Sequence, residues 1–255
     1  MGHETITRSR AIRRAGRRAL AALLVAAAIA GAATAGTDPA SADADRSAPP
    51  RRLSETGLFV AGTREVRPEN LPYLPQYPLW SDGAYKRRWL YLPPGTSIDA
   101  TRPDAWTFPP GTRLWKEFGH GRPIETRFIE RRADGAWRFA TYVWNADGSD
   151  AELAPPERAT VIAAPDAPGG RYVLPSRADC LACHDAAPVP VLGVSALQLS
   201  PDRDPLAPHA EPARAEQVDL RGLAARGLVR NLPPVLLERA PRIDASSPTA
   251  RAALG

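Results

Sequence analysis

The chain has two cysteines, which lie three positions apart, and a histidine follows the second one directly. They are Cys180, Cys183 and His184, in the stretch "SRADCLACHDAAPVP". Two thiols and an imidazole at this spacing suit four kinds of site: a disulfide, a redox-active dithiol, a zinc site or a covalent haem anchor. The four alternatives differ in what each requires from the rest of the chain.

Three of these alternatives leave the histidine unexplained. A disulfide across so short a loop would add little stability. A thioredoxin-like dithiol needs a strand-to-helix junction in a βαβ unit, which the sequence pattern does not indicate. A structural zinc site needs four ligands. With no third cysteine, zinc would have to recruit His209, His120 or carboxylates.

A covalent haem anchor accounts for all three residues. In a C-x-x-C-H motif the thiols form thioether bonds to the haem vinyl groups, and the imidazole is the proximal ligand of the iron. The three residues must lie close together because the vinyl groups and the iron belong to one macrocycle. We therefore expect haem c at Cys180 and Cys183, with His184 as the proximal iron ligand.

The sequence leaves the sixth iron ligand open. The only methionine is Met1, which a cleaved signal peptide would remove, so methionine ligation is excluded. His209 in "PLAPHAEP" and His120 in "FGHGRP" are the candidate distal ligands. The alternative is a five-coordinate iron, or one ligated by lysine or water. Two histidine ligands would favour electron transfer, whereas an open position would favour ligand binding or peroxide chemistry.

The N-terminal residues 1–44 have the pattern of a signal peptide. Six arginines precede an apolar run of about a dozen residues, and small residues with two A-x-A sites follow. An uncleaved membrane anchor is the alternative, but the run is shorter than the ~20 residues that span a bilayer. We expect export to the periplasm and no stable membrane span after cleavage. The segment also holds much of the chain's net charge of +5, and no basic face with interleaved aromatic residues follows it, so nucleic acid is not an expected partner.

The next part of the chain has the pattern of a β-rich domain. Residues 45–58 are polar and are expected to form a flexible lead-in, and residues 59–175 contain short runs of aromatic and β-branched residues. Pro/Gly turns such as "LPPGT" and "FPPGT" separate these runs. The pattern predicts an antiparallel sandwich or barrel-like fold, with strands in "KRRWLYLP", "TRLWKEF", "ETRFIERR", "WRFATYVWN" and "ATVIAAP".

Residues 176–255 are expected to form a mostly helical or irregular, cytochrome c-like segment that attaches the haem. Helical spacing predicts an amphipathic helix in "RAEQVDLRGLAARGLV", and "PVLLERAP" predicts a further short helix or turn. The last residues, "SSPTARAALG", have a helix-start pattern with Ser247 as N-cap and Pro248 in the first turn. This beginning of a helix leads us to expect that the chain is C-terminally truncated, with a frayed tail as the alternative.

From about Leu53 onward the chain resembles a group of poorly characterised bacterial periplasmic c-type haem proteins, often described as di-haem. The resemblance rests on the motifs "LSETGLF", "YPLWSDGAYKRRWLYLPPGT", "WTFPPGTRLWKEF", "ETRFIERRADGAWRFATYVWN", "VLPSRADCLACH" and "VLGVSALQL". It implies a β-rich domain followed by a haem-binding part. It also implies a second C-x-x-C-H motif after a helix that begins like "SPTARAALG". The sequence contains that helix start but no second C-x-x-C-H motif.

Electron transfer is the function that these observations favour, with a periplasmic dehydrogenase or another cytochrome as redox partner. One alternative is a haem enzyme, peroxidase- or oxidase-like, with an open distal site. Its candidate distal groups are Arg113, Lys116, Glu117 and His120. The other alternative is a ligand-binding β-sandwich with an accessory or vestigial haem site. That reading requires solvent-exposed rings at Trp80, Trp89, Trp106 and Trp115.

Overall fold

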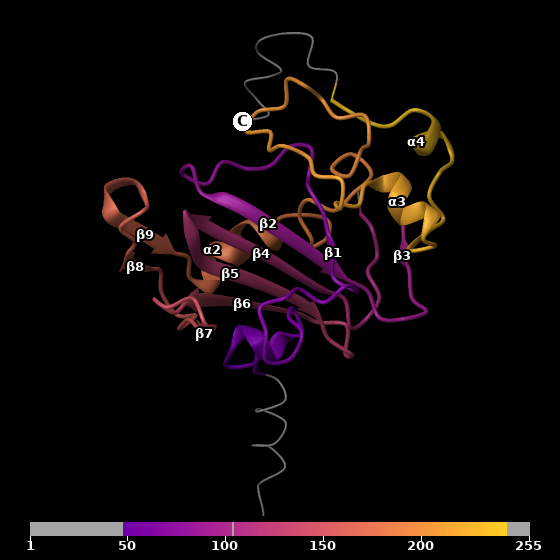
Figure 1. Ribbon diagram of the computed structural model, residues 1–255. Helices are drawn as coiled ribbons and strands as arrows, with labels where there is room; N and C mark the ends of the chain where they lie inside the picture. Colours follow the sequence, from indigo (N-terminus) through magenta and orange to yellow (C-terminus); the bar gives the residue numbers. More distant parts are fainter. Residues whose placement is uncertain (1–47, 104, 244–255) are drawn as a thin grey trace, which may run out of the picture. The chain divides into compact units, whose positions relative to one another are not determined.

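Runs of alternating apolar and charged residues form the strands of a six-stranded antiparallel sheet with the order β1-β2-β4-β5-β6-β7 (Figure 1). The computed structural model describes residues 48–103 and 105–243. Two two-stranded sheets, β10-β3 and β8-β9, accompany the large sheet. The prediction of an antiparallel, β-rich region is therefore confirmed. The described strands form an open sheet with edges at β1 and β7, and not a closed barrel.

The elements follow the predicted runs closely. The strands are β1 (Leu71–Pro72), β2 (Tyr85–Tyr91), β3 (Ile98–Asp99), β4 (Arg113–His120), β5 (Arg122–Arg131), β6 (Trp137–Trp144), β7 (Ala151–Leu153), β8 (Thr160–Ala163), β9 (Arg171–Leu174) and β10 (Val229–Arg230). The helices are η1 (Leu53–Thr56), η2 (Pro168–Gly170), α2 (Arg177–His184), α3 (Leu220–Ala225) and α4 (Val235–Glu238).

The described part of the lead-in predicted for residues 45–58 is held against the sheet, where the backbone N–H of Leu153 donates to the Arg51 carbonyl. Leu53 and Leu58 are fully buried; Leu53 begins η1, and Leu58 follows it. Both leucines pack in a core under one face of the sheet, with Trp115 and Phe128. Apolar side chains of this size gain stability from burial, which explains why this stretch is ordered. The predicted signal peptide, residues 1–44, lies outside the described residues.

The opposite face of the large sheet carries a second core, which joins the β-rich region to the later part of the chain. Leu90 of β2 and Leu114 of β4 pack in one cluster with Val191, Leu199 and Leu223. Residues before and after position 175 therefore share one hydrophobic core, and both belong to one compact unit, Ala44–Gly255. This shared core fixes the later segment against the sheet.

The later segment contains short helices joined by irregular chain. The helix predicted in "RAEQVDLRGLAARGLV" is shorter than expected, because α3 begins only at Leu220. Asp219 caps it: its carboxylate accepts a hydrogen bond from the backbone N–H of Gly222 at 2.7 Å. The short helix predicted in "PVLLERAP" is confirmed as α4. The predicted C-terminal helix start at Ser247 and Pro248 lies outside the described residues.

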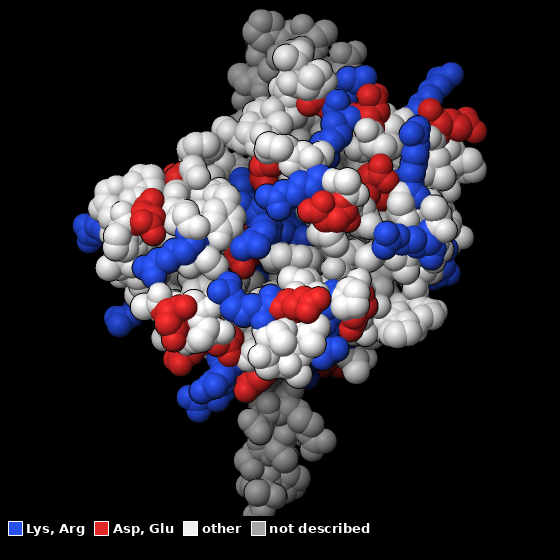
Figure 2. All heavy atoms as spheres, in the orientation of Figure 1, with Lys and Arg blue, Asp and Glu red and all other residues white. Residues whose placement is uncertain are grey.

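Acidic and basic side chains are interspersed over the face of the molecule shown in Figure 2. The described residues include exposed ion pairs such as Arg67–Glu69 and Arg242–Asp202. In the part of the chain that the structure describes, no helix is both long and apolar enough to cross a membrane.

Candidate functional site

The two cysteines and the histidine lie together on α2, a helix that the sequence reasoning did not predict. Its first turn is closed by a reciprocal cap: the Ser176 hydroxyl accepts from the backbone N–H of Asp179, and the Asp179 carboxylate accepts from the backbone N–H of Ser176 at 2.8 Å. The Ser176 hydroxyl also donates to the Asp179 carboxylate at 2.7 Å, and this hydrogen bond, followed by the one from the Ser176 backbone N–H, lowers the pKa of Asp179. A Ser followed three residues later by an acidic residue is a helix-start signature, so the sequence does contain a sign of this helix.

Cys180, Cys183 and His184 all line one cavity of about 350 Å³, which we call the α2 cavity. The opposite wall comes from one face of the sheet, where Arg88, Lys116 and Arg127 contribute side chains. Cofactor sites usually have volumes of roughly 300–1,000 Å³, so the cavity is of a suitable size. The motif therefore faces an interior space and not bulk solvent alone.

The imidazole of His184 is held by the chain that follows α2. Its Nδ1 lies 2.5 Å from the carbonyl oxygen of Pro190. Because a carbonyl oxygen only accepts, Nδ1 carries the hydrogen and donates, which leaves the lone pair of Nε2 available. The Phe139 ring of β6 packs beside the imidazole, with ring centroids 5.2 Å apart. Burial lowers the pKa of His184, so the neutral, metal-binding form is favoured.

Both thiols are free, and neither forms a disulfide. Cys180 is half-buried and Cys183 is exposed. Burial raises the pKa of Cys180, so its thiol stays protonated near neutral pH. Positions i and i+3 of a helix lie on the same side, and this places the two sulfurs on the side of α2 that borders the cavity.

These residues fit a covalently attached haem. Two thiols beside each other can bind the two vinyl groups, and the imidazole has its tautomer fixed by the Pro190 carbonyl, as metal-ligating histidines usually have. The apolar side chains of Leu114, Ile129 and Val191 supply part of the remaining wall. The donor set and the partly apolar lining are compatible with covalent haem attachment.

The two candidate distal histidines do not line the α2 cavity. His120 ends β4 and lines a neighbouring cavity of about 460 Å³, where its ring contacts that of Tyr172. His209 lines another cavity, of about 590 Å³, and its ring lies 5.1 Å from that of Trp80. The structure thus brings neither histidine together with His184 in one cavity.

Three cations cross the sheet beneath α2 in a single row, which we call the cation row. Arg88 of β2, Lys116 of β4 and Arg127 of β5 are cross-strand neighbours in the register of the sheet. Arg88 makes two hydrogen bonds to the Glu211 carboxylate, at 2.9 and 3.0 Å. Arg127 pairs with Glu125 at 2.6 Å. Each of the two arginines is therefore paired with a carboxylate.

The other groups named for a distal site are separated by the two-residue period of β4. Successive side chains of a strand point to opposite faces, so Arg113 and Glu117 lie on the face away from Lys116. There Arg113 pairs with Glu130, and Arg87 pairs with Glu117. Of the four groups expected near one hairpin, Lys116 alone lines the α2 cavity.

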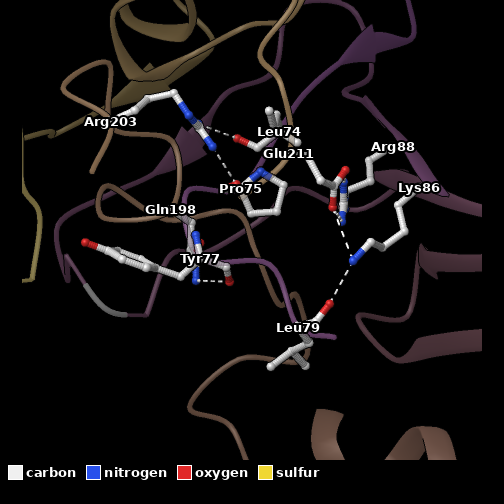
Figure 3. Close-up of polar contacts among 9 residues, drawn as sticks. All are labelled: Leu74, Pro75, Tyr77, Leu79, Lys86, Arg88, Gln198, Arg203 and Glu211. Carbon is white, nitrogen blue, oxygen red and sulfur yellow. Dashed lines mark hydrogen bonds and ion pairs between the residues drawn. The ribbon is translucent and has the colours of Figure 1, made fainter. Parts of the chain in front are cut away.

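Residues 73–79 form a further wall of the α2 cavity and are held by side chains from distant parts of the chain (Figure 3). Arg203 donates to the carbonyl oxygens of Leu74 and Pro75 at 3.1 and 2.8 Å. Lys86 donates to the carbonyl of Leu79 at 2.8 Å. These contacts fix irregular backbone at the cavity wall, where no strand pairing would do so.

The tryptophans are mainly core residues. Trp89, Trp106 and Trp115 are buried, and Trp115 donates its indole N–H to the Thr56 hydroxyl at 2.8 Å. Trp80 is 60 % exposed. The aromatic binding platform required by the β-sandwich alternative needs all four rings at the surface, and three of them are in the interior.

Comparison with known proteins adds no relative: no family model matches the chain, and neither a curated protein nor a solved structure does. Within residues 48–103 and 105–243, no group of three or more His, Cys, Asp or Glu side chains is arranged to hold a metal ion.

Sequence reasoning missed two features of this site. The Pro190 carbonyl that orients His184 carries no sequence signal, because any residue supplies a carbonyl. The cation row carries only a partial signal, since "KRRWLYLP", "TRLWKEF" and "ETRFIERR" each contain basic residues but also place charged residues such as Arg87, Arg113 and Glu130 on the opposite face. The register that aligns the three strands is set by tertiary packing and could not be read from the sequence.

Proposed function

We propose that this chain is an exported c-type haem protein that carries electrons in the periplasm. Haem c is attached through Cys180 and Cys183, and His184 is the proximal ligand of the iron. The segment after residue 175 is the haem-binding part, and the β-rich region before it supplies the opposite wall. The observation that carries the proposal is the shared cavity of the two thiols and an imidazole whose Nδ1 is held by Pro190.

The residues around the site have separable roles in this proposal. A bound haem supplies a reversible one-electron couple. The Pro190 carbonyl keeps His184 in one tautomer and orientation, and Phe139 packs against its ring. Leu114, Ile129 and Val191 exclude water from the cavity wall. The partner would be a redox protein such as a periplasmic dehydrogenase or a second cytochrome.

A redox titration with a ligand-binding assay tests electron transfer against the alternative of a peroxidase- or oxidase-like enzyme. The full-length protein is produced in a host with c-type maturation machinery. We expect one reversible one-electron couple, with no binding of carbon monoxide by the reduced protein and no sustained peroxide consumption. An electron carrier has both axial positions filled, so exogenous ligands do not enter. Rapid carbon monoxide binding together with peroxide turnover would favour the enzyme.

A further inference from the structure

Lys116 is the member of the cation row that has no carboxylate partner. Among the described residues its ammonium group makes no hydrogen bond or ion pair, and its contact is with the Phe118 ring, 4.7 Å from the centroid. Glu211 and Glu125 are already engaged by Arg88 and Arg127. A positive charge on a half-buried lysine between two guanidinium groups is unfavourable.

The amine of Lys116 can therefore lose its proton near neutral pH. Burial, followed by the positive charges of Arg88 and Arg127, lowers the pKa of Lys116 to about 7. A neutral amine has a lone pair that can bind a metal. The two arginines cannot act in this way because a guanidinium remains protonated.

Other possible iron donors that line the α2 cavity are engaged elsewhere. The Tyr77 hydroxyl bonds to Asp204 and accepts from the backbone of Ile243. Asp179 caps α2. Burial raises the pKa of Tyr73 to about 12, which keeps that phenol protonated. Lys116 therefore combines an amine without a hydrogen bond or ion pair among the described residues with a pKa low enough for the amine to be neutral, which the Tyr73 phenol does not.

Building on the proposed function, we infer that the ε-amine of Lys116 is the sixth ligand of the haem iron, with His184 as the fifth. Lys116 lines both the α2 cavity and the neighbouring cavity that contains His120. Its four-carbon stem is flexible, and its amine is held only by an aromatic ring. This assignment replaces the two histidines expected as distal ligands with a residue of the sheet face that borders the motif.

Three substitutions at one position separate ligation from a purely electrostatic role. Lys116→Ala removes both the amine and the charge, Lys116→Arg keeps a charge that cannot ligate, and Lys116→Met supplies a neutral side chain that can. Each variant is matured in the same host and its haem content is measured first. The ferric spin state is then read by electron paramagnetic resonance and by the visible absorption spectrum.

We expect low-spin ferric iron in the wild type, conversion to high spin in both Lys116→Ala and Lys116→Arg, and a return to low spin in Lys116→Met. A low-spin Lys116→Arg variant would overturn the assignment and give Lys116 the role of neutralising a haem propionate. A high-spin wild type would overturn it as well. In both of these cases the haem content stays at one per chain, so the proposed function stands while the inference fails.

A measurement on the wild type guards against variants that fail to fold. Protein labelled with nitrogen-15 in its lysine side chains should show a hyperfine coupling between the ferric iron and a lysine nitrogen. A spectrum without this coupling, from a haem-loaded low-spin sample, would contradict the inference.

Discussion

Replacing Glu211 with glutamine is expected to lower the free energy of unfolding by about 3–5 kcal/mol. The Glu211 carboxylate pairs with Arg88 at 2.9 Å and with Lys86 at 3.3 Å, and both cations have side chains that are at most 5 % exposed. Without the carboxylate, two buried positive charges have no counter-charge, and their desolvation is no longer compensated. Urea denaturation followed by circular dichroism measures this loss.

The matched control for Glu211→Gln is Glu69→Gln. Glu69 pairs with Arg67 at 3.3 Å, but both side chains are more than 40 % exposed. Exposed ion pairs contribute between 0 and about 1 kcal/mol, so this variant should unfold close to the wild type. Equal, small effects of the two substitutions would show that the Arg88–Glu211 pair does not support the cavity wall.

The Glu211 pair also predicts how stability depends on pH. Burial opposes ionisation of Glu211, but its hydrogen bonds to Arg88 and the charges of Arg88 and Lys86 outweigh burial and lower its pKa. A carboxyl whose pKa is lowered in the folded state stabilises that state above its ordinary pKa of 4.5. The wild type should therefore lose this contribution as the pH falls below that value, whereas Glu211→Gln should not.

Replacing Trp115 with alanine is expected to destabilise the protein by about 3–5 kcal/mol. Trp115 is only 1 % exposed and packs against Phe128, with ring centroids 5.6 Å apart. The substitution would leave a large cavity and would remove the hydrogen-bond donor to the Thr56 hydroxyl. Thermal or urea unfolding measures the change.

Trp80→Ala is the control for this second prediction. Trp80 belongs to the same set of aromatic residues, but most of its ring is exposed. Surface substitutions usually change stability by less than about 0.5 kcal/mol. If Trp115→Ala were as stable as Trp80→Ala, Trp115 would not be a core residue of the sheet.

The parts of the fold that could be predicted are those with a strong local composition signal. Aromatic and β-branched residues between Pro/Gly turns in "KRRWLYLP" and "ETRFIERR" predicted β2 and β5, because such runs favour strands. The start of α3 was predicted too early, because Asp219 caps the helix there and Val218 before it pairs with the backbone at Pro72 and Tyr73. Leu53 and Leu58 were assigned to a flexible lead-in because a short polar stretch conceals how deeply two leucines are buried.

The site was predictable to a smaller extent. Spacing alone singled out Cys180, Cys183 and His184, since the chemistry of haem attachment constrains consecutive residues. The spacing could not identify the residues that face Cys180, Cys183 and His184, because these residues come from strands and loops far away in the chain. Proximity in sequence groups Lys116 with Arg113, Glu117 and His120, but the fold separates these four into different environments.

Covalent haem attachment is tested most directly by the intact mass of the exported protein under denaturing conditions, beside that of the Cys180→Ala/Cys183→Ala variant. We expect the wild type to gain the mass of one haem and to keep it through denaturation and acid extraction. The double variant should gain none. A correctly processed wild-type protein without haem, from a host that matures a control cytochrome c, would contradict the proposed function.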